Sequence, residues 1–192
     1  MSRSNRPLWL SRTDSIRVFH GNIAPCLTPV LSRVDGFMPD SSQLQDVADA
    51  YKTAIRLLSR REHSCYELSR KLKSRGIHQE IIVQTISSLT QEGLISDARF
   101  TESYVRVRIG KGFGPLRIRS ELGELGIQDE MIAQYMEHDE EFWLESAMTA
   151  RIKRFGEDQP EDTKAWSKQA RFLQQRGFNT SIVRKILGNC YT

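Results

Sequence analysis

The chain's most unusual segment, residues 104–119, combines side chains that bind anions with residues that form tight turns. Three glycines alternate with Lys111 and Phe113, and a proline that suits the first turn of a helix follows them. Arginines stand on both sides of this turn: Arg106, Arg108, Arg117 and Arg119. Cationic side chains beside an aromatic ring suit binding of phosphate with stacking on a base, and they suit an acidic cleft of a protein equally well. The alternative is that Phe113 folds back as a packing residue and the arginines are only solvated.

A second basic segment, residues 60–75, offers Arg70, Lys73 and Arg75 for contact with a phosphate backbone. Sequence-specific reading of bases is not indicated, because the next helix, residues 81–89, is too apolar to face a DNA groove. The segment therefore predicts at most non-specific contact with DNA.

Other chemistry finds no support in the residue pattern. Lys111 is followed by glycine where a nucleotide-binding P-loop needs Ser or Thr, and a helix rather than a strand precedes the glycines. Three cysteines and four histidines show no metal-ligand spacing: Cys26, Cys65, Cys190, His20, His63, His78 and His138. No catalytic triad or pair of carboxylates in an apolar frame is present, so we expect a protein that is not an enzyme and has no cofactor or metal.

Charge is distributed in blocks along the chain although the net charge is only +4. Residues 51–119 carry fourteen Lys or Arg against six Asp or Glu. Residues 120–150 carry nine acidic residues and no basic one, and residues 151–192 return to nine basic against four acidic. Basic blocks suit a polyanion or an acidic protein face, and the acidic block suits a basic face.

The elements that position these residues are predicted to be helices that repeat about every fifty residues. Gly76, Gly126 and Gly177 each follow a leucine by four positions and precede an apolar residue directly. Apolar residues recur six and ten positions after each glycine, which indicates a helix, a glycine-capped turn and a second helix written three times. A further helix precedes each copy, at about residues 97–109 in the second, with Phe100, Tyr104 and Val107 on one face.

These patterns predict an all-α fold of three tandem three-helix repeats that form an elongated, curved array. The predicted repeats cover residues 46–96, 97–138 and 139–192. Residues 1–45, where prolines are scattered without apolar periodicity, are predicted to be a disordered extension. No apolar run is long enough to span a membrane and no secretory signal is evident, which predicts a cytoplasmic protein.

Several motifs resemble the RecX family of regulatory proteins. They run in order through residues 46–190: AIRLLSRREHS at 54–64, ELSRKL at 67–72, GLISDARF at 93–100, KGFGPLRIRSEL at 111–122, Gly126-Ile127 and RFLQQRGF at 171–178. The extension before residue 46 has no counterpart in the family pattern.

The resemblance implies a protein that modulates RecA, usually as an inhibitor, in DNA repair, recombination and the SOS response. It would lie along the groove of the RecA–DNA filament and limit filament growth, ATP hydrolysis and strand exchange, and we expect it to be a monomer. The alternative is a helical protein that binds DNA non-specifically and competes with RecA for single strands. The resemblance supplies no agreed set of site residues, so the candidates rest on local chemistry: Arg70, Lys73, Arg75, Arg106, Arg108, Lys111, Phe113, Arg117 and Arg119.

Overall fold

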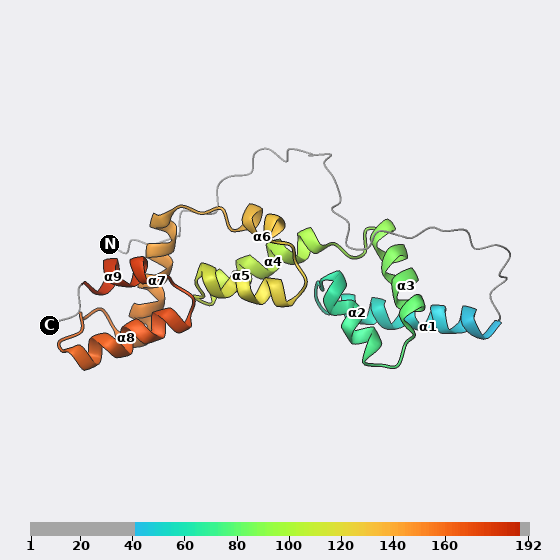
Figure 1. The fold of residues 1–192 in the computed structure, drawn as a ribbon, viewed down its shortest axis with the longest axis horizontal. Coiled ribbons are helices and arrows are strands. Elements are labelled where there is room, and N and C mark those ends of the chain that lie inside the picture. The colour runs from blue at the N-terminus through green and yellow to red at the C-terminus, as the bar shows by residue number, and fades with distance from the viewer. Residues whose placement is uncertain (1–40, 189–192) are drawn as a thin grey trace, which may run out of the picture. The chain divides into compact units, whose positions relative to one another are not determined.

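The computed structural model describes residues 41–188, and within them the chain forms nine α-helices (Figure 1). All of these residues belong to one compact unit, Pro39–Thr192. The helices group in chain order as α1 (Ser41–Leu58), α2 (Cys65–Lys73) and α3 (Gln79–Gln91); α4 (Asp97–Gly110), α5 (Pro115–Glu124) and α6 (Asp129–Tyr135); α7 (Glu140–Phe155), α8 (Thr163–Gln175) and α9 (Thr180–Leu187). These trios are the first, second and third repeats, and they confirm the predicted all-helical fold.

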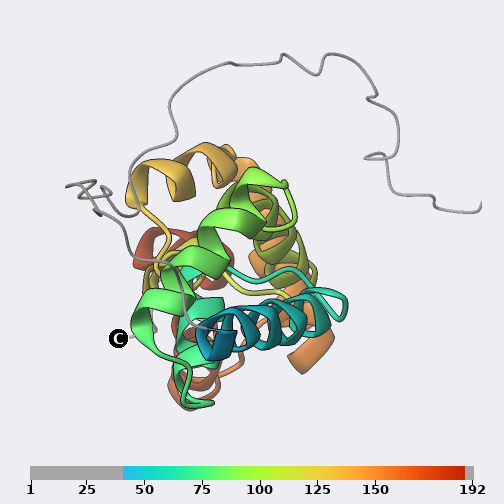
Figure 2. The same ribbon diagram turned by 90° about the vertical axis from the view of Figure 1, so that its right-hand side faces the viewer.

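Within each repeat every helix packs on the other two, and Figures 1 and 2 agree in placing α3 beside α1. The first helix begins at Ser41, five residues before its predicted start at Asp46. The prediction made for residues 1–40 lies outside the described residues.

The helix starts follow the capping chemistry that the sequence suggests. The sequence Ser64-Cys-Tyr-Glu67 is a capping box, and the Ser64 hydroxyl accepts a hydrogen bond from the Glu67 amide at 3.0 Å at the start of α2. The second bond that a capping box predicts, from the Ser64 amide to the Glu67 carboxylate, does not form. That carboxylate instead accepts hydrogen bonds from Arg61 and pairs with His63, because these stronger partners lie within its reach.

The inner face of α4 agrees with the predicted one at Phe100 and Tyr104, which pack in or against the core, and differs from it at Val107. Val107, expected inside with Phe100, is 49% exposed, whereas Val105 is 4% exposed and faces the core. Thr101 is fully buried beside them, because its hydroxyl donates to the Asp97 carbonyl at 2.7 Å and so leaves no unpaired polar group. Apolar periodicity counts only hydrophobic residues, so it does not assign a buried threonine to the inner face. The predicted inner face is therefore displaced around the helix axis from the observed one.

Two hydrophobic cores hold the three repeats. One lies within the first repeat and contains Leu68, Leu72 and Ile82. The other runs through both the second and third repeats, from Phe100 in α4 to Leu187 in α9. The second and third repeats therefore share one apolar interior, whereas the first repeat keeps its own.

The second and third repeats also meet backbone to backbone. The Gly114 amide, at the start of α5, donates to the Arg176 carbonyl at 2.7 Å, and the Leu116 amide donates to the Gly177 carbonyl at 3.0 Å. A Cβ atom at Gly114 would lie 2.6 Å from the Gly177 carbonyl oxygen, so only glycine permits this approach. Free amides at the start of α5 thereby donate to carbonyls of the turn that follows α8.

The first and second repeats meet at the equivalent positions through different groups. The Ser64 hydroxyl donates to the Leu125 carbonyl at 2.7 Å, and Gly126 lies against the Tyr66 side chain. Both turn glycines have positive φ, +79° at Gly126 and +90° at Gly177, as the glycine-capped turn predicts. In each junction the turn of the later repeat packs on the start of the middle helix of the earlier repeat.

Candidate interaction site

The glycine-rich turn between α4 and α5 places Phe113 at the centre of a group of arginines. The guanidinium carbons of Arg108, Arg117 and Arg176 lie 5.0, 4.7 and 5.0 Å from the centre of the Phe113 ring. Phe113 itself is half-buried and packs against the core of the second and third repeats. We call these four residues the Phe113 cluster. The three guanidinium groups surround the Phe113 ring, as in the alternative in which Phe113 folds back as a packing residue.

Arg176 is the member of the cluster that the sequence did not suggest as a site residue. Its guanidinium donates to the Lys111 carbonyl at 2.5 Å and to the Gly112 carbonyl at 3.2 Å. These bonds hold the glycine-rich turn of the second repeat against the third. The equivalent position before the turn glycine is Arg75 in the first repeat and Leu125 in the second, so the arginine is present in two of the three repeats.

Glu121 is the carboxylate that compensates this cluster. It pairs with Arg108 at 2.9 Å and with Arg117 at 3.0 Å, and it accepts a hydrogen bond from the Tyr104 hydroxyl at 3.1 Å. Burial raises the pKa of the Tyr104 hydroxyl above its ordinary 10.0, although a hydrogen bond from Arg108 acts in the opposite direction. Arg108 and Arg117 therefore both have intramolecular partners, although the Arg117 side chain is 45% exposed, and Arg117 also donates to the Gln175 carbonyl at 3.0 Å.

Three candidate cations near this turn point outward instead. Arg106, Lys111 and Arg119 are exposed, and within residues 41–188 none of these side chains has an ion pair or hydrogen bond. Charged groups of this kind are ready to meet an external anion without first breaking a bond inside the protein.

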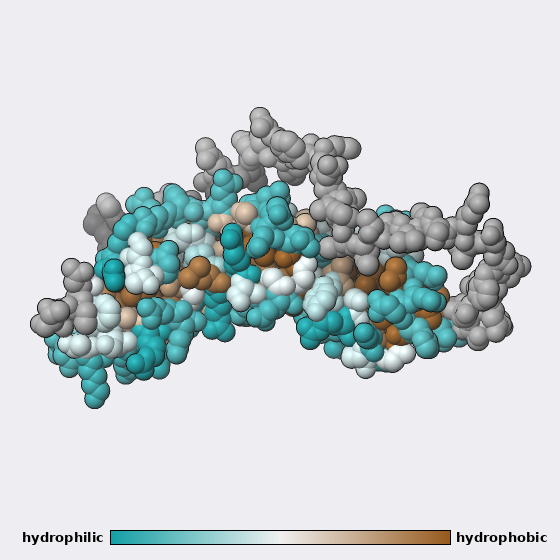
Figure 3. All heavy atoms as spheres, in the orientation of Figure 1, coloured by the Kyte–Doolittle hydropathy of each residue, from teal (hydrophilic) through white to brown (hydrophobic). Residues whose placement is uncertain are grey.

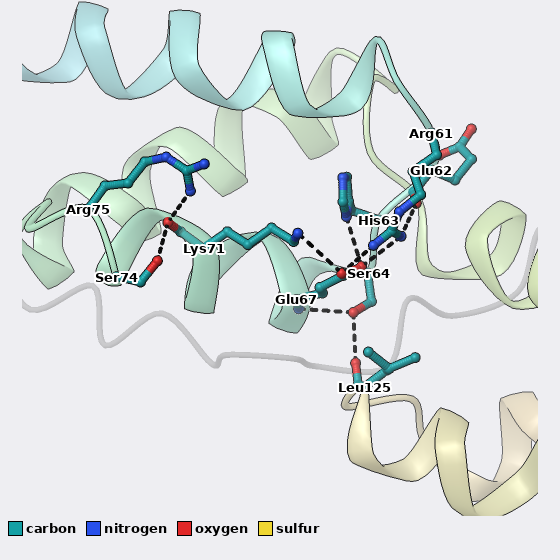
Figure 4. Close-up of polar contacts among 9 residues, drawn as sticks. All are labelled: Arg61, Glu62, His63, Ser64, Glu67, Lys71, Ser74, Arg75 and Leu125. Atoms are coloured by element: carbon teal, nitrogen blue, oxygen red, sulfur yellow. Dashed lines mark hydrogen bonds and ion pairs between the residues drawn. The ribbon is translucent and has the colours of Figure 1, made fainter.

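The second basic segment lies on α2 and the turn after it. Arg70 and Lys73 are exposed, with the Arg70 guanidinium 5.9 Å from the Tyr66 ring centre. Arg75 donates to the Lys71 carbonyl at 2.7 Å, which ties it to the end of its own helix (Figure 4). The structure thus gathers the candidates into two groups, one on the first repeat and one around the α4–α5 turn.

A polar network lies at the junction of the first and second repeats (Figure 4). Glu67 accepts two hydrogen bonds from Arg61, the first at 2.9 Å, and pairs with the buried His63 at 2.8 Å. Burial alone raises the pKa of Glu67, but the hydrogen bonds from Arg61 and His63 outweigh it, so the pKa is lower than usual. The anionic form of Glu67 is thereby stabilised one turn from the Ser64–Leu125 contact.

An open groove lies beside this network, between the first and second repeats. Its first-repeat side is formed by Arg61, Glu62 and Glu67. Its second-repeat side is formed largely by α4, including Tyr104, Val107 and Arg108, together with Lys111 and Leu125. Glu62 is paired with Arg99 at 3.1 Å and Glu67 with Arg61, so both carboxylates of the groove already have intramolecular partners.

Comparison with known proteins matches each repeat to a domain of one family. Residues 50–89 match the first three-helix domain of RecX, residues 96–136 the second, and residues 140–187 the third. The chain belongs to the RecX family.

Individual RecX proteins resemble this chain over most of their length. Regulatory protein RecX of Pseudomonas putida (strain GB-1) is 40% identical over 136 residues, which are 71% of this chain and 87% of that protein. Regulatory protein RecX of Halorhodospira halophila is 42% identical over 131 residues, 68% of this chain and 81% of that protein. The crystal structure of RecX from Lactobacillus salivarius superposes with a TM-score of 0.62 at 26% identity, covering 74% of this chain and 95% of that one.

Within residues 41–188 the RecX-family chain has neither a membrane-spanning helix nor a cluster of metal ligands. No helix in this range is long and apolar enough to cross a membrane. No group of three or more His, Cys, Asp or Glu side chains there is placed to hold a metal ion.

Proposed function

We propose that this RecX-family protein binds the RecA–DNA filament and restrains it, lowering ATP hydrolysis, filament growth and strand exchange. The observation that carries the proposal is the match of all three repeats, in order, to the three RecX domains. The name of its relatives, Regulatory protein RecX, supports a regulatory role. We further propose that it acts as a monomer in the cytoplasm.

The contact surface is formed by the outward cations of the two candidate groups. Arg106, Lys111 and Arg119 lie near the α4–α5 turn, and Arg70 and Lys73 lie on α2. In this proposal Arg108, Phe113 and Arg117 hold the turn in place, Arg75 remains beside its helix end, and the exposed cations meet anionic groups of the filament.

A simpler function also fits the exposed cations, which are suited to phosphate. The protein would then bind single-stranded DNA non-specifically and exclude RecA by occupying its sites. This mechanism requires enough protein to cover the DNA, whereas a filament regulator acts at far lower amounts.

Titration of the protein into a single-strand-dependent ATPase reaction of the cognate RecA, at fixed DNA, separates these functions. We expect strong inhibition well below one molecule per RecA protomer. Inhibition only when the protein saturates the DNA would favour competition. No inhibition by folded, monodisperse protein would contradict both.

A further inference from the structure

The groove between the first and second repeats has an apolar floor that the fold leaves without a partner. Val107 of α4 lines it and is 49% exposed, beside Tyr104 and the nearly buried Phe100. Figure 3 shows hydrophobic residues at the surface in the region that α4 occupies in Figure 1. An apolar floor enclosed by charged side chains is typical of a surface that binds another macromolecule.

The charges around this floor are not balanced. Glu62 and Glu67 are each neutralised inside the protein, by Arg99 and by Arg61. Lys111, on the rim, has no ion pair or hydrogen bond of its ammonium group within residues 41–188. The unsatisfied charge of the groove is therefore positive, and its occupant must bring an anionic group.

The apolar side chains indicate whether that anion belongs to a protein or to a nucleic acid. Single-stranded nucleic acid binds by stacking its bases on exposed aromatic rings. The Phe113 ring is surrounded by three guanidinium groups, and Tyr104 is half-buried with its hydroxyl bound to Glu121. The exposed apolar side chain in the groove is instead aliphatic, which has no flat face for a base but packs readily on protein side chains.

We propose that the groove binds a protein segment in which an apolar side chain lies next to a carboxylate. The apolar side chain packs on Val107 and Tyr104, and the carboxylate pairs with Lys111. This inference rests on the proposed function and extends it, because it assigns this contact with the filament to the protein component rather than to DNA.

The test compares binding of variants to two probes: cognate RecA filaments assembled on an immobilised oligothymidylate with a slowly hydrolysed ATP analogue, and the same oligothymidylate without RecA. Val107→Asp places a carboxylate on the floor of the groove. This carboxylate would face the apolar side chain of the bound segment and repel the carboxylate of that segment. We expect filament affinity to fall by about tenfold or more and affinity for the bare oligonucleotide to change by less than about twofold. Lys111→Glu is expected to weaken filament binding to a similar extent.

Two further variants keep the result interpretable. Val83→Asp introduces the same charge at an exposed position of α3 outside the groove, 38% exposed, and should bind filaments like wild type. Val107→Thr keeps the shape of valine, so it provides a milder loss of affinity should Val107→Asp unfold the protein.

Wild-type filament affinity in both Val107 variants would overturn the groove as a docking surface while leaving the proposed function intact. A larger loss for the bare oligonucleotide than for filaments would assign the groove to nucleic acid and overturn a protein occupant. Failure of the wild-type protein itself to bind filaments would overturn the proposed function, and the inference with it.

Discussion

Replacement of Gly114 with alanine tests whether the backbone contact between the second and third repeats stabilises the protein. Gly114 has φ of −89°, so alanine can adopt its conformation without strain, and a loss of stability must come from the contact. The new Cβ atom would lie 2.6 Å from the Gly177 carbonyl oxygen and 2.7 Å from the Phe178 amide nitrogen. These are backbone atoms that cannot rotate away, so the two repeats must separate.

The expected magnitude follows from the bonds that this separation breaks. The Gly114–Arg176 and Leu116–Gly177 hydrogen bonds are lost or lengthened, and the shared core beside them is disturbed. Two hydrogen bonds and a modest overpacking cost together about 2–4 kcal/mol of unfolding free energy. For a chain of this size that corresponds to a melting temperature lower by about 5–15 °C.

Thermal unfolding followed by circular dichroism measures this, with two accompanying variants. Gly114→Ser restores a good helix-capping side chain but keeps the clash, so it should melt almost as low as alanine. Gly123→Ala lies on the exposed side of α5, where a Cβ atom meets nothing within 4 Å, and should melt slightly above wild type. If both Gly114 variants melted with wild type, the backbone junction would contribute nothing and this account of the interface would be wrong.

Three further predictions concern charged side chains. Arg151 is 1% exposed, and its guanidinium donates to the Gln169 side chain and to the Glu157 and Asp158 carbonyls. Because Arg151→Met removes these bonds, it should lower the unfolding free energy by about 2–4 kcal/mol, as measured by urea titration. Arg119→Glu should leave the melting temperature unchanged but weaken inhibition of RecA, whereas Arg117→Glu should also lower the melting temperature, because it breaks contacts with Glu121 and Gln175. Folding lowers the pKa of Glu67 below its ordinary value of 4.5. The stabilisation from its carboxylate is therefore fully present above pH 4.5 and is lost as the pH falls through the pKa of Glu67 in the folded protein. Glu67→Gln should therefore melt below wild type at pH 6, and the difference should shrink by pH 3; an equal difference at both pH values would contradict the ion pairing.

The sequence predicted the helices and turns well, because these depend on local signals. Apolar periodicity and the glycines near residues 76, 126 and 177 were sufficient to place three repeats. The inner face of α4 was predicted correctly at Phe100 and Tyr104 and wrongly at Val107, since burial of Thr101 depends on a hydrogen bond within the helix that hydrophobicity does not register.

The candidate site was less predictable, because its geometry depends on residues far apart in the chain. Arg117 contacts the Gln175 carbonyl across 58 residues, and Arg176 reaches the turn at Lys111 across 65. Spacing along the sequence could identify the arginines of residues 104–119 but not which of them acquire partners within the protein. Arg108 and Arg117 pair with Glu121, whereas Arg106 and Arg119 have no ion pair or hydrogen bond within residues 41–188, a difference that appears only after folding.

The two junctions show how one repeat architecture produces different interfaces. In both, the residue before a turn glycine offers its carbonyl to the start of the middle helix of the preceding repeat. At the second junction that helix starts with Gly114, whose missing side chain lets two backbones meet and two cores merge. At the first it starts with Ser64, so the contact passes through a hydroxyl and Gly126 packs on the Tyr66 side chain. The first repeat consequently retains a separate core, and the groove that exposes Val107 opens at that side-chain-mediated junction. Serine at one junction and glycine at the equivalent position of the other thus give one contact through a side chain and one through two backbones.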